Sequence, residues 1–431
     1  MTDTIFALSS GAPPAGIAVI RISGPQAHVS LVALAGKLPP PRRAVLAVLR
    51  GADLQVLDRA MALWLPGPGT ATGEDSAELH LHGGRAVVAA VEAALAAMPG
   101  LRRAEPGEFT RRSFANGRID LAEAEGLADL LAAETELQRR TAMTMADGAL
   151  SRMVAGWRGR VLALSAAIEA SLDFAGEDEI DEQGAAIPSG IADGCAALSL
   201  ELGTWLGRPR AEPLREGFRV VLAGPPNAGK STLFNALLED EAAITAAEPG
   251  TTRDVLVRAV AIGGLPFCLV DTAGLRDEGA GPIEQIGIAR ARAEAERADL
   301  VLWLGPEGEG PGNRVVWEIA AQIDRADAPA KRAARHRVSA LSGEGLDDLR
   351  SALVALARTA LPAPGDVALN ARQHRLLAEV ADAAAEAGEC SDPLLAAENL
   401  RLARAALDRL VGRTGTEDML DALFGRFCIG K

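Results

Sequence analysis

The segment Gly224-Pro225-Pro226-Asn227-Ala228-Gly229-Lys230-Ser231 has the spacing G-x-x-x-x-G-K-S, which is typical of a loop that binds phosphates. Backbone N–H groups of such a loop point at the α- and β-phosphates, the Lys reaches the β/γ oxygens, and the Ser hydroxyl ligates Mg²⁺. An apolar run at residues 218–223 precedes the loop, and a helix-like run from Thr232 follows, so the phosphates would lie at a helix N-terminus. We therefore expect phosphate and Mg²⁺ contacts from Asn227, Ala228, Gly229, Lys230, Ser231 and Thr232.

Two segments downstream extend this pattern. Asp271-Thr272-Ala273-Gly274 ends a strand-like run, where the Asp can hold Mg²⁺ through water and the Gly N–H can meet a γ-phosphate. Thr251 and Thr252 lie between the two motifs, and a Thr there can give Mg²⁺ a second hydroxyl ligand. The ordered set of three segments indicates a GTPase-like domain.

The residue that orients the attacking water is less obvious. Leu275 stands where a Ras-like enzyme has a Gln, and a Leu cannot position water. Glu284 is the nearest plausible carboxylate, although an acid at the start of a surface helix is the plainer interpretation.

Recognition of guanine normally needs N-K-x-D after a later strand. Here the matching segment is Ala321-Gln322-Ile323-Asp324, which keeps only the Asp, and an alternative alignment at 324–327 restores a basic residue but not the Asn. We favour Asp324 because it directly follows the strand-like stretch 315–321. Ser339, Ala340 and Leu341 resemble the S-A-x loop that packs against the base, so the sequence predicts GTP over ATP, with weakened affinity.

Composition limits the class of protein. The chain has 431 residues and a net charge of −14, so we expect two or three domains and no overall basic face for nucleic acid. The basic clusters at 102–103, 111–112, 139–140 and 331–337 are expected to be solvated surface. Widely spaced cysteines indicate reduced thiols in the cytoplasm, and neither a membrane span nor a secretory signal is expected.

The periodicity of apolar residues predicts multidomain α/β architecture. Residues 1–118 are expected to form an N-terminal α+β domain with strands at 18–22, 60–65 and 77–82 and a helix at 85–98. Glu78, His80 and His82 would share one strand face, but a metal site there is not expected because no Cys or third His is near. A helical domain at 119–213 plus 361–431, with a long helix at 142–172, would contain the inserted Ras-like α/β G domain at 214–360.

Several motifs together resemble one known family. The chain ends in Phe427-Cys428-Ile429-Gly430-Lys431, and it carries Pro249-Gly250-Thr251-Thr252-Arg253-Asp254 and Asp271-Thr272-Ala273-Gly274-Leu275-Arg276. The N-terminal region adds the segments at 72–75, 78–84 and 106–114. With the phosphate loop, these motifs resemble the MnmE (TrmE) family of bacterial tRNA-modification GTPases over the whole chain.

The resemblance implies a function. Such enzymes hydrolyse GTP, are activated by K⁺, and bind a tetrahydrofolate derivative (5,10-methylene- or formyl-tetrahydrofolate) in the N-terminal domain. With the flavoprotein MnmG, in a heterotetramer, they place an aminomethyl or carboxymethylaminomethyl group on C5 of a wobble uridine in tRNA. They form homodimers through the N-terminal domain, and their G domains meet during hydrolysis.

Individual positions can be matched to the family. Asn227 matches a K⁺ ligand, and the loop at 244–251, with Ala246, Glu248 and Thr251, matches the segment whose carbonyls complete that site. Glu248-Pro249 departs from the pattern, because proline fixes φ in this loop. Ser231 and Thr252 match the Mg²⁺ ligands, and Glu284 matches the catalytic Glu. The folate-contacting positions are occupied by Arg21, Glu78, Arg118 and Lys431.

The family's C-terminal thiol position is Cys428, for which a part in the modification chemistry and simple burial remain open. Two alternative functions also remain: an Era-like ribosome-assembly switch, which would need a basic RNA-binding domain, and a hydrolysis-impaired scaffold, suggested by the altered base-binding motif.

Overall fold

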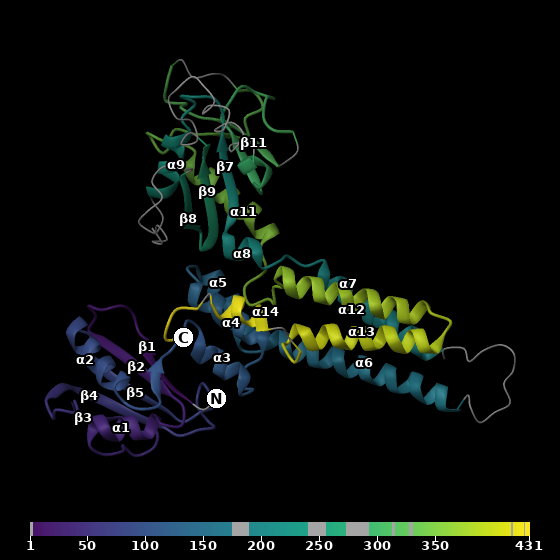
Figure 1. Ribbon diagram of the computed structural model, residues 1–431. Helices are drawn as coiled ribbons and strands as arrows, with labels where there is room; N and C mark the ends of the chain where they lie inside the picture. Colours follow the sequence, from purple (N-terminus) through teal and green to yellow (C-terminus); the bar gives the residue numbers. More distant parts are fainter. Residues whose placement is uncertain are drawn as a thin grey trace, which may run out of the picture. The chain divides into compact units, whose positions relative to one another are not determined.

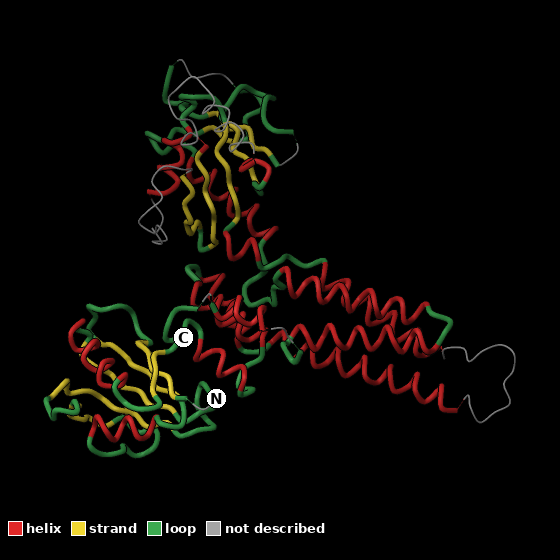
Figure 2. The backbone as a smooth tube through the Cα atoms, in the orientation of Figure 1, coloured by secondary structure: helices red, strands yellow, loops and turns green. Residues whose placement is uncertain are grey.

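The computed structural model describes residues 3–174, 189–239, 256–272, 293–312, 315–326, 331–414, 417–425 and 427–431. The chain divides into two compact units (Figure 1). The first unit combines Met1–Ala128 with Asp408–Lys431, and the second comprises Asp129–Leu407. Each unit contains one six-stranded sheet among the described residues, with helices around it (Figure 2).

The sheet of the first unit has the strand order β3-β4-β5-β2-β1-β6, in which only β1 and β6 pair in parallel. One face is apolar because alternate strand residues point to it, and helices α1 (Ala27–Ala35) and α2 (Arg85–Ala96) cover that face. The strands are β1 (Thr4–Leu8), β2 (Ile17–Ser23), β3 (Val45–Arg50), β4 (Val56–Leu65), β5 (Ser76–His82) and β6 (Leu101–Arg103).

The rest of the first unit is helical and includes the C-terminus. Helix α3 (Glu108–Ala115) and the start of α4 (Leu121–Ala132) pack with α14 (Glu417–Phe424) through aromatic side chains. The Phe114 and Phe424 rings lie 6.1 Å apart. Residues from opposite ends of the chain therefore build one core.

The second unit begins with a helical bundle. Its helices are α5 (Glu136–Ala146), α6 (Ala149–Phe174), α7 (Ser189–Leu206), α12 (Ala371–Glu389) and α13 (Pro393–Leu410). The short helix α8 (Glu212–Glu216) follows α7 and packs against the sheet of the inserted α/β domain. Helices α7 and α12 run antiparallel, because Leu206 meets His374 at one end and Ala192 meets Gly388 at the other. A Cβ on Gly388 would lie 3.0 Å from Cys195 Cβ, so glycine permits the close approach.

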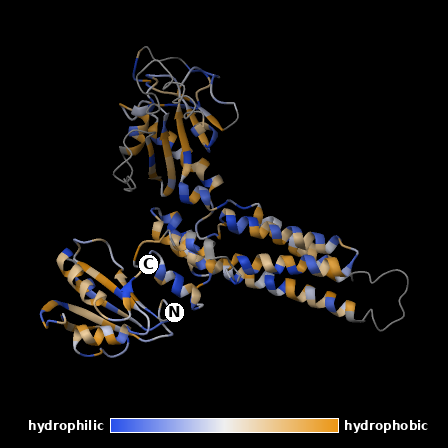
Figure 3. Ribbon diagram, in the orientation of Figure 1, coloured by the Kyte–Doolittle hydropathy of each residue, from blue (hydrophilic) through white to orange (hydrophobic). Residues whose placement is uncertain are grey.

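The hydropathy of the side chains differs between the strands and the bundle helices. The strands are largely hydrophobic, whereas α12 and α13 carry hydrophilic and hydrophobic residues on different sides, as expected of amphipathic bundle helices (Figure 3). Among the described residues, no helix has both the length and the apolar character needed to cross a membrane.

An α/β domain is inserted between α7 and α12 in the chain, as the sequence predicts. Its strand order is β12-β11-β10-β7-β9-β8, and every pairing is parallel except that of β8 with β9. The strands are β7 (Phe218–Ala223), β8 (Leu256–Ile262), β9 (Leu265–Asp271), β10 (Leu300–Trp303), β11 (Val316–Ala320) and β12 (His336–Arg337).

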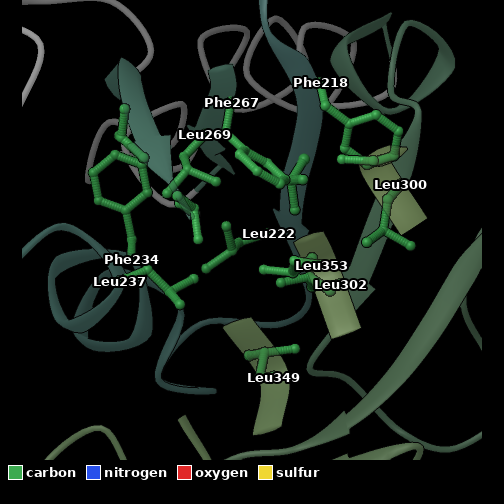
Figure 4. Packing of buried hydrophobic residues seen from close by; sticks show 14 of the residues in the cluster. Phe218, Leu222, Phe234, Leu237, Phe267, Leu269, Leu300, Leu302, Leu349 and Leu353 are labelled. Carbon is green, nitrogen blue, oxygen red and sulfur yellow. The ribbon is translucent and has the colours of Figure 1, made fainter. Parts of the chain in front are cut away.

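Helices α9 (Lys230–Glu239) and α11 (Leu346–Ala360) cover one face of this sheet with leucine and phenylalanine side chains (Figure 4). Phe234 and Leu237 of α9 pack toward Leu222 and Leu269 of the central strands. Burial of this apolar layer fixes β7 and α9, and with them the loop that joins them.

The structure corrects two expectations about elements. The predicted helix at 142–172 is two helices, because the chain breaks at Gly148, whose φ of 77° lies in the left-handed region. Strands β1, β3 and β6 of the first unit were not predicted, since each is short and its alternation is weak in the sequence. The predicted acidic break at 176–179 lies outside the described residues.

Candidate functional site

The phosphate loop joins β7 to α9, as predicted. Gly224 has φ 149°, and a Cβ there would lie 3.0 Å from the Gly305 nitrogen, so only glycine fits beside that backbone. Asn227 and Gly229 also have positive φ, at 62° and 87°. Left-handed residues at this spacing turn successive N–H groups toward one point, which is the geometry of an anion-binding nest.

The side chains at the helix start lie beside this loop. Lys230 is 5% exposed, and its Nζ donates to the carbonyl oxygens of Gly224 at 3.0 Å and Pro225 at 2.7 Å. Ser231 Oγ donates to Asp271 Oδ2 at 2.6 Å. The sequence predicted Ser231 and Asp271 as partners of one Mg²⁺, and the structure brings the hydroxyl from α9 and the carboxylate from β9 together.

The strand end at Asp271 is firmly held. Asp271 is fully buried, and the hydroxyl of Thr272 donates to the Leu222 carbonyl at 2.8 Å. Because Leu222 pairs with Asp271 across the sheet, this bond fixes the two strand ends that carry the site.

The base-binding candidates also meet. Ser339 is fully buried, and its hydroxyl donates to Asp324 Oδ1 at 2.6 Å, while Ser342 N donates back to Ser339 Oγ at 3.1 Å. Asp324 is exposed and therefore open to a ligand. Ala340 and Leu341 follow directly, and Leu341 is 81% exposed, which leaves an apolar side chain in water near the Asp.

Gln322 occupies the Lys position of N-K-x-D. Its φ is 56°, and its Nε2 donates to the Asn227 carbonyl at 3.3 Å. A Cβ on Gly229 would lie 3.1 Å from the same amide nitrogen, so the Gln side chain covers the phosphate loop. The sequence indicated no role for Gln322, because only the Asp of N-K-x-D is kept. The structure shows that Gln322 links the base-binding segment to the phosphate loop.

A second group of predicted residues lies in the first unit. Arg21 and Glu78 are directly paired across β2 and β5, and Arg21 Nε and Nη2 both donate to Glu78 Oε1 at 3.1 Å. Glu78 Oε2 lies 3.3 Å from His80 Nε2, and the Arg21 guanidinium lies 5.8 Å from the centre of the Phe109 ring. The expected sharing of a face by Glu78 and His80 is confirmed.

The C-terminal segment docks on the same unit. Ser9 Oγ donates to the Gly430 carbonyl at 2.7 Å, and Gly107 N donates to the Cys428 carbonyl at 3.4 Å. Gly430 has φ 97°, and a Cβ there would lie 2.0 Å from the Leu8 carbonyl oxygen, which explains the glycine. Cys428 is exposed, so simple burial is the wrong interpretation of this thiol, while Lys431 is half-buried.

Arg118 follows α3 and is exposed. Its stem lies beside Gly73, where a Cβ would come within 3.2 Å of Arg118 Cγ, and Asn116 Nδ2 donates to the Thr72 carbonyl at 2.7 Å. Residues 72–74, which contact Arg118 and Asn116, also contact β2, because Glu74 accepts a hydrogen bond of 2.8 Å from Ser23.

A cluster of charges that the sequence did not reveal supports this region. Arg112 is fully buried, and its guanidinium donates to the side chains of Asp3, Glu74 and Glu108 at 2.9–3.3 Å. Arg102 adds bonds of 2.6 and 2.8 Å to the two Glu108 oxygens. Burial alone would raise the pKa of Glu108, but the hydrogen bonds from Arg102, the Glu105 backbone and Arg112 outweigh it and hold that pKa below its usual value.

Two basic residues were therefore wrongly expected at the surface. Arg112 is one, and Lys331, 7% exposed, is the other, since its Nζ donates to Glu318 Oε2 at 2.6 Å and to the Trp303 carbonyl at 2.9 Å. Arg139, in contrast, is exposed and pairs with the exposed Glu136.

Comparison with known proteins identifies the family. The model of the MnmE helical domain matches residues 121–428, and that of the GTP-binding protein TrmE N-terminus matches residues 4–118. Proteins named tRNA modification GTPase MnmE are 69% identical in Novosphingobium aromaticivorans and 63% identical in Erythrobacter litoralis, over 100% of both chains in each case. The Sphingopyxis alaskensis relative is 59% identical over 96% of this chain and 100% of its own.

The chain belongs to the tRNA modification GTPase MnmE family. The resemblance expected from the motifs is thereby confirmed, as are the fold class and the assignment as a GTP-binding GTPase.

The remaining predicted site residues lie outside the described residues. They are Ala246, Glu248, Thr251, Thr252, Ala273, Gly274 and Glu284. Their roles as ligands or catalyst stay predictions.

Proposed function

We propose that this chain hydrolyses GTP to drive tRNA modification with the flavoprotein MnmG. The product would be an aminomethyl or carboxymethylaminomethyl group on C5 of a wobble uridine, built from a folate one-carbon unit. The observation that carries the GTPase part is the Ser231–Asp271 pair at 2.6 Å beside Lys230 and a loop of left-handed residues. The tRNA part rests on the relatives named tRNA modification GTPase.

In the proposed mechanism, the loop N–H groups and Lys230 hold the β- and γ-phosphates and offset charge that develops on the leaving oxygen. Water attacks the γ-phosphorus, the bond to the β-phosphate oxygen breaks, and GDP and phosphate leave. Glu284 would orient the water, because Leu275 cannot. Asp324, held by Ser339, would accept guanine N–H donors.

The donor atoms of Ser231 and Asp271 support a Mg²⁺ site. The Ser231 hydroxyl and the Asp271 carboxylate are hard oxygen groups of the kind that Mg²⁺ prefers, and Thr252 would add a second hydroxyl. Mg²⁺, when bound, supplies charge neutralisation at the phosphates. Asn227, with Ala246, Glu248 and Thr251 of the neighbouring loop, would hold K⁺.

The first unit would hold the folate derivative. Arg21 and Glu78 have side chains 30% and 20% exposed, so a guanidinium and a carboxylate remain partly open to a ring rich in N–H and carbonyl groups. Arg118 and Lys431 would add positive charge for carboxylates. Cys428 is exposed at the docked C-terminus and would take part in the modification chemistry.

We also propose a homodimer formed through the N-terminal domain, a heterotetramer with MnmG, and action in the cytoplasm. These assignments follow from family membership. The division at residues 118, 213 and 360 into folate-binding, helical and G domains is proposed on the same basis.

GTP turnover in KCl and in NaCl, for wild type and Glu284→Ala, tests the catalytic proposal. We expect fast turnover in KCl only, and its loss in the variant. Slow turnover in both salts, unchanged by the substitution, would favour the hydrolysis-impaired scaffold.

A further inference from the structure

Two short segments of the second unit form one surface. Residues 206–211 start at the last residue of α7, and residues 370–375 comprise the N-cap and the first residues of α12. His374 Nε2 donates to the Leu206 carbonyl at 3.2 Å, and Ala211 N donates to the Leu369 carbonyl at 3.0 Å. These two bonds hold the segments side by side.

This surface is basic in an acidic protein. The two segments contain Arg208, Arg210, Arg372 and Arg375 and no Asp or Glu, although the chain as a whole has a net charge of −14. We call these four arginines the arginine face. Except for Arg372, which is half-buried, its members are exposed.

Two acids, Glu212 and Glu379, border the arginine face. Glu212 accepts a hydrogen bond from the backbone N–H of Ala371 at 2.5 Å. Glu379, which is half-buried, lies 3.4 Å from Arg375, whose side chain is 67% exposed. A surface pair of this kind is worth less than about 1 kcal/mol, so a phosphate can displace the carboxylate.

One arginine is held in a defined position. The Arg208 guanidinium carbon lies 3.5 Å from the centre of the Trp205 ring. Trp205 in turn contacts Trp157, which is 3% exposed and donates to Glu201 at 2.8 Å. A guanidinium stacked on an aromatic ring keeps its in-plane N–H donors available to an acceptor and loses less entropy on binding.

We propose that the arginine face binds backbone phosphates of the tRNA substrate, an inference that rests on the proposed function. Clustered guanidinium groups suit a polyanion, and phosphate contacts position a nucleic acid without reading its sequence. The face adds a local basic surface to a chain whose overall charge would repel RNA.

Titration of labelled tRNA by the full-length protein, followed by fluorescence anisotropy from about 50 to 200 mM KCl, tests the proposal. The variant is Arg208→Gln/Arg210→Gln. Each phosphate contact contributes about 0.7–0.9 to the slope of log K against log salt, so losing two should reduce the slope by about 1.4–1.8. The matched control is Arg401→Gln/Arg404→Gln, two exposed arginines of α13 with the same change in net charge.

We expect weaker binding and a smaller slope in the first variant only, with GTP turnover unchanged in both. Equal binding by wild type and the first variant, equal loss in both variants, or no binding by wild type would overturn the proposal. So would loss, in the first variant, of binding to vesicles of anionic lipid while tRNA binding persisted. Modification of tRNA is measured separately: a wild type that modifies tRNA with MnmG leaves the proposed function intact even where the arginine face fails.

Discussion

Replacement of Arg112 by Met should destabilise the first unit far more than expected for the surface residue that the sequence predicted. The guanidinium is fully buried and contacts three carboxylates. Glu108 would keep Arg102, but Glu74, whose side chain is 14% exposed, would keep only its hydroxyl partner, Ser23, among the contacts described above. Breaking a buried pair by removing one partner costs about 3–5 kcal/mol, because it leaves an uncompensated charge.

The matched control is Arg103→Met. Arg103 neighbours Arg102 in the sequence, but its pair with Glu92 is 67% exposed on the arginine side, so its loss should cost about 0–1 kcal/mol. A double variant, Arg112→Met with Glu74→Gln, removes the orphaned charge and should regain about 1–3 kcal/mol relative to the sum of the single changes.

Urea unfolding of the full chain labelled with 5-fluorotryptophan can isolate this unit, because Trp64 is its only tryptophan. Trp64 is 7% exposed in the core of the sheet. With m near 2 kcal/mol/M, the midpoint of its ¹⁹F transition should fall by about 2 M for Arg112→Met and by less than about 0.5 M for Arg103→Met. Equal shifts for the two variants would refute the argument that burial makes Arg112 important.

Acid should destabilise the same unit, because the pKa values of Asp3 and Glu108 are lowered from 3.8 and 4.5 in the folded protein. The contribution of these carboxylates to the free energy of unfolding is therefore complete above about pH 4.5 and is lost as pH falls through the folded pKa values. The ¹⁹F unfolding transition measured from pH 3 to 6 would detect this loss. Gln322→Ala should raise the Kd for labelled GDP several-fold by freeing the phosphate loop, and Gln322→Lys should restore it; equal affinities in equilibrium titrations would contradict the link. Gly430→Ala should expose the C-terminal segment to faster hydrogen exchange, because its Cβ meets the β1 carbonyl at 2.0 Å, whereas Gly11→Ala, with nothing within 4 Å, should not.

Local patterns predicted the strand–loop–helix geometry at residues 218–239 well, because that geometry depends on residues close in sequence. Strand, loop and helix are contiguous, and glycines mark the left-handed positions. The meeting of Asp324 with Ser339 followed from the order of parallel strands, since their carboxyl ends share one edge of the sheet.

Local patterns did not predict some contacts between residues that are far apart in the sequence. Arg112 donates to Glu74 and Asp3, which lie 38 and 109 positions away in the sequence. Its sequence neighbour Arg111 instead suggested a cluster of surface charges. Likewise, nothing adjacent to Gln322 indicates that its amide reaches the phosphate loop, 95 residues earlier. Both contacts depend on tertiary packing that periodicity cannot express.

The most direct test of the proposed function is modification of an unmodified tRNA by this chain with MnmG, a folate one-carbon donor, an amine donor, K⁺ and Mg²⁺. Nucleoside mass spectrometry would compare GTP with a non-hydrolysable GTP analogue. We expect a modified wobble uridine with GTP only. Equal modification with the analogue would contradict the claim that hydrolysis at the phosphate loop drives the reaction.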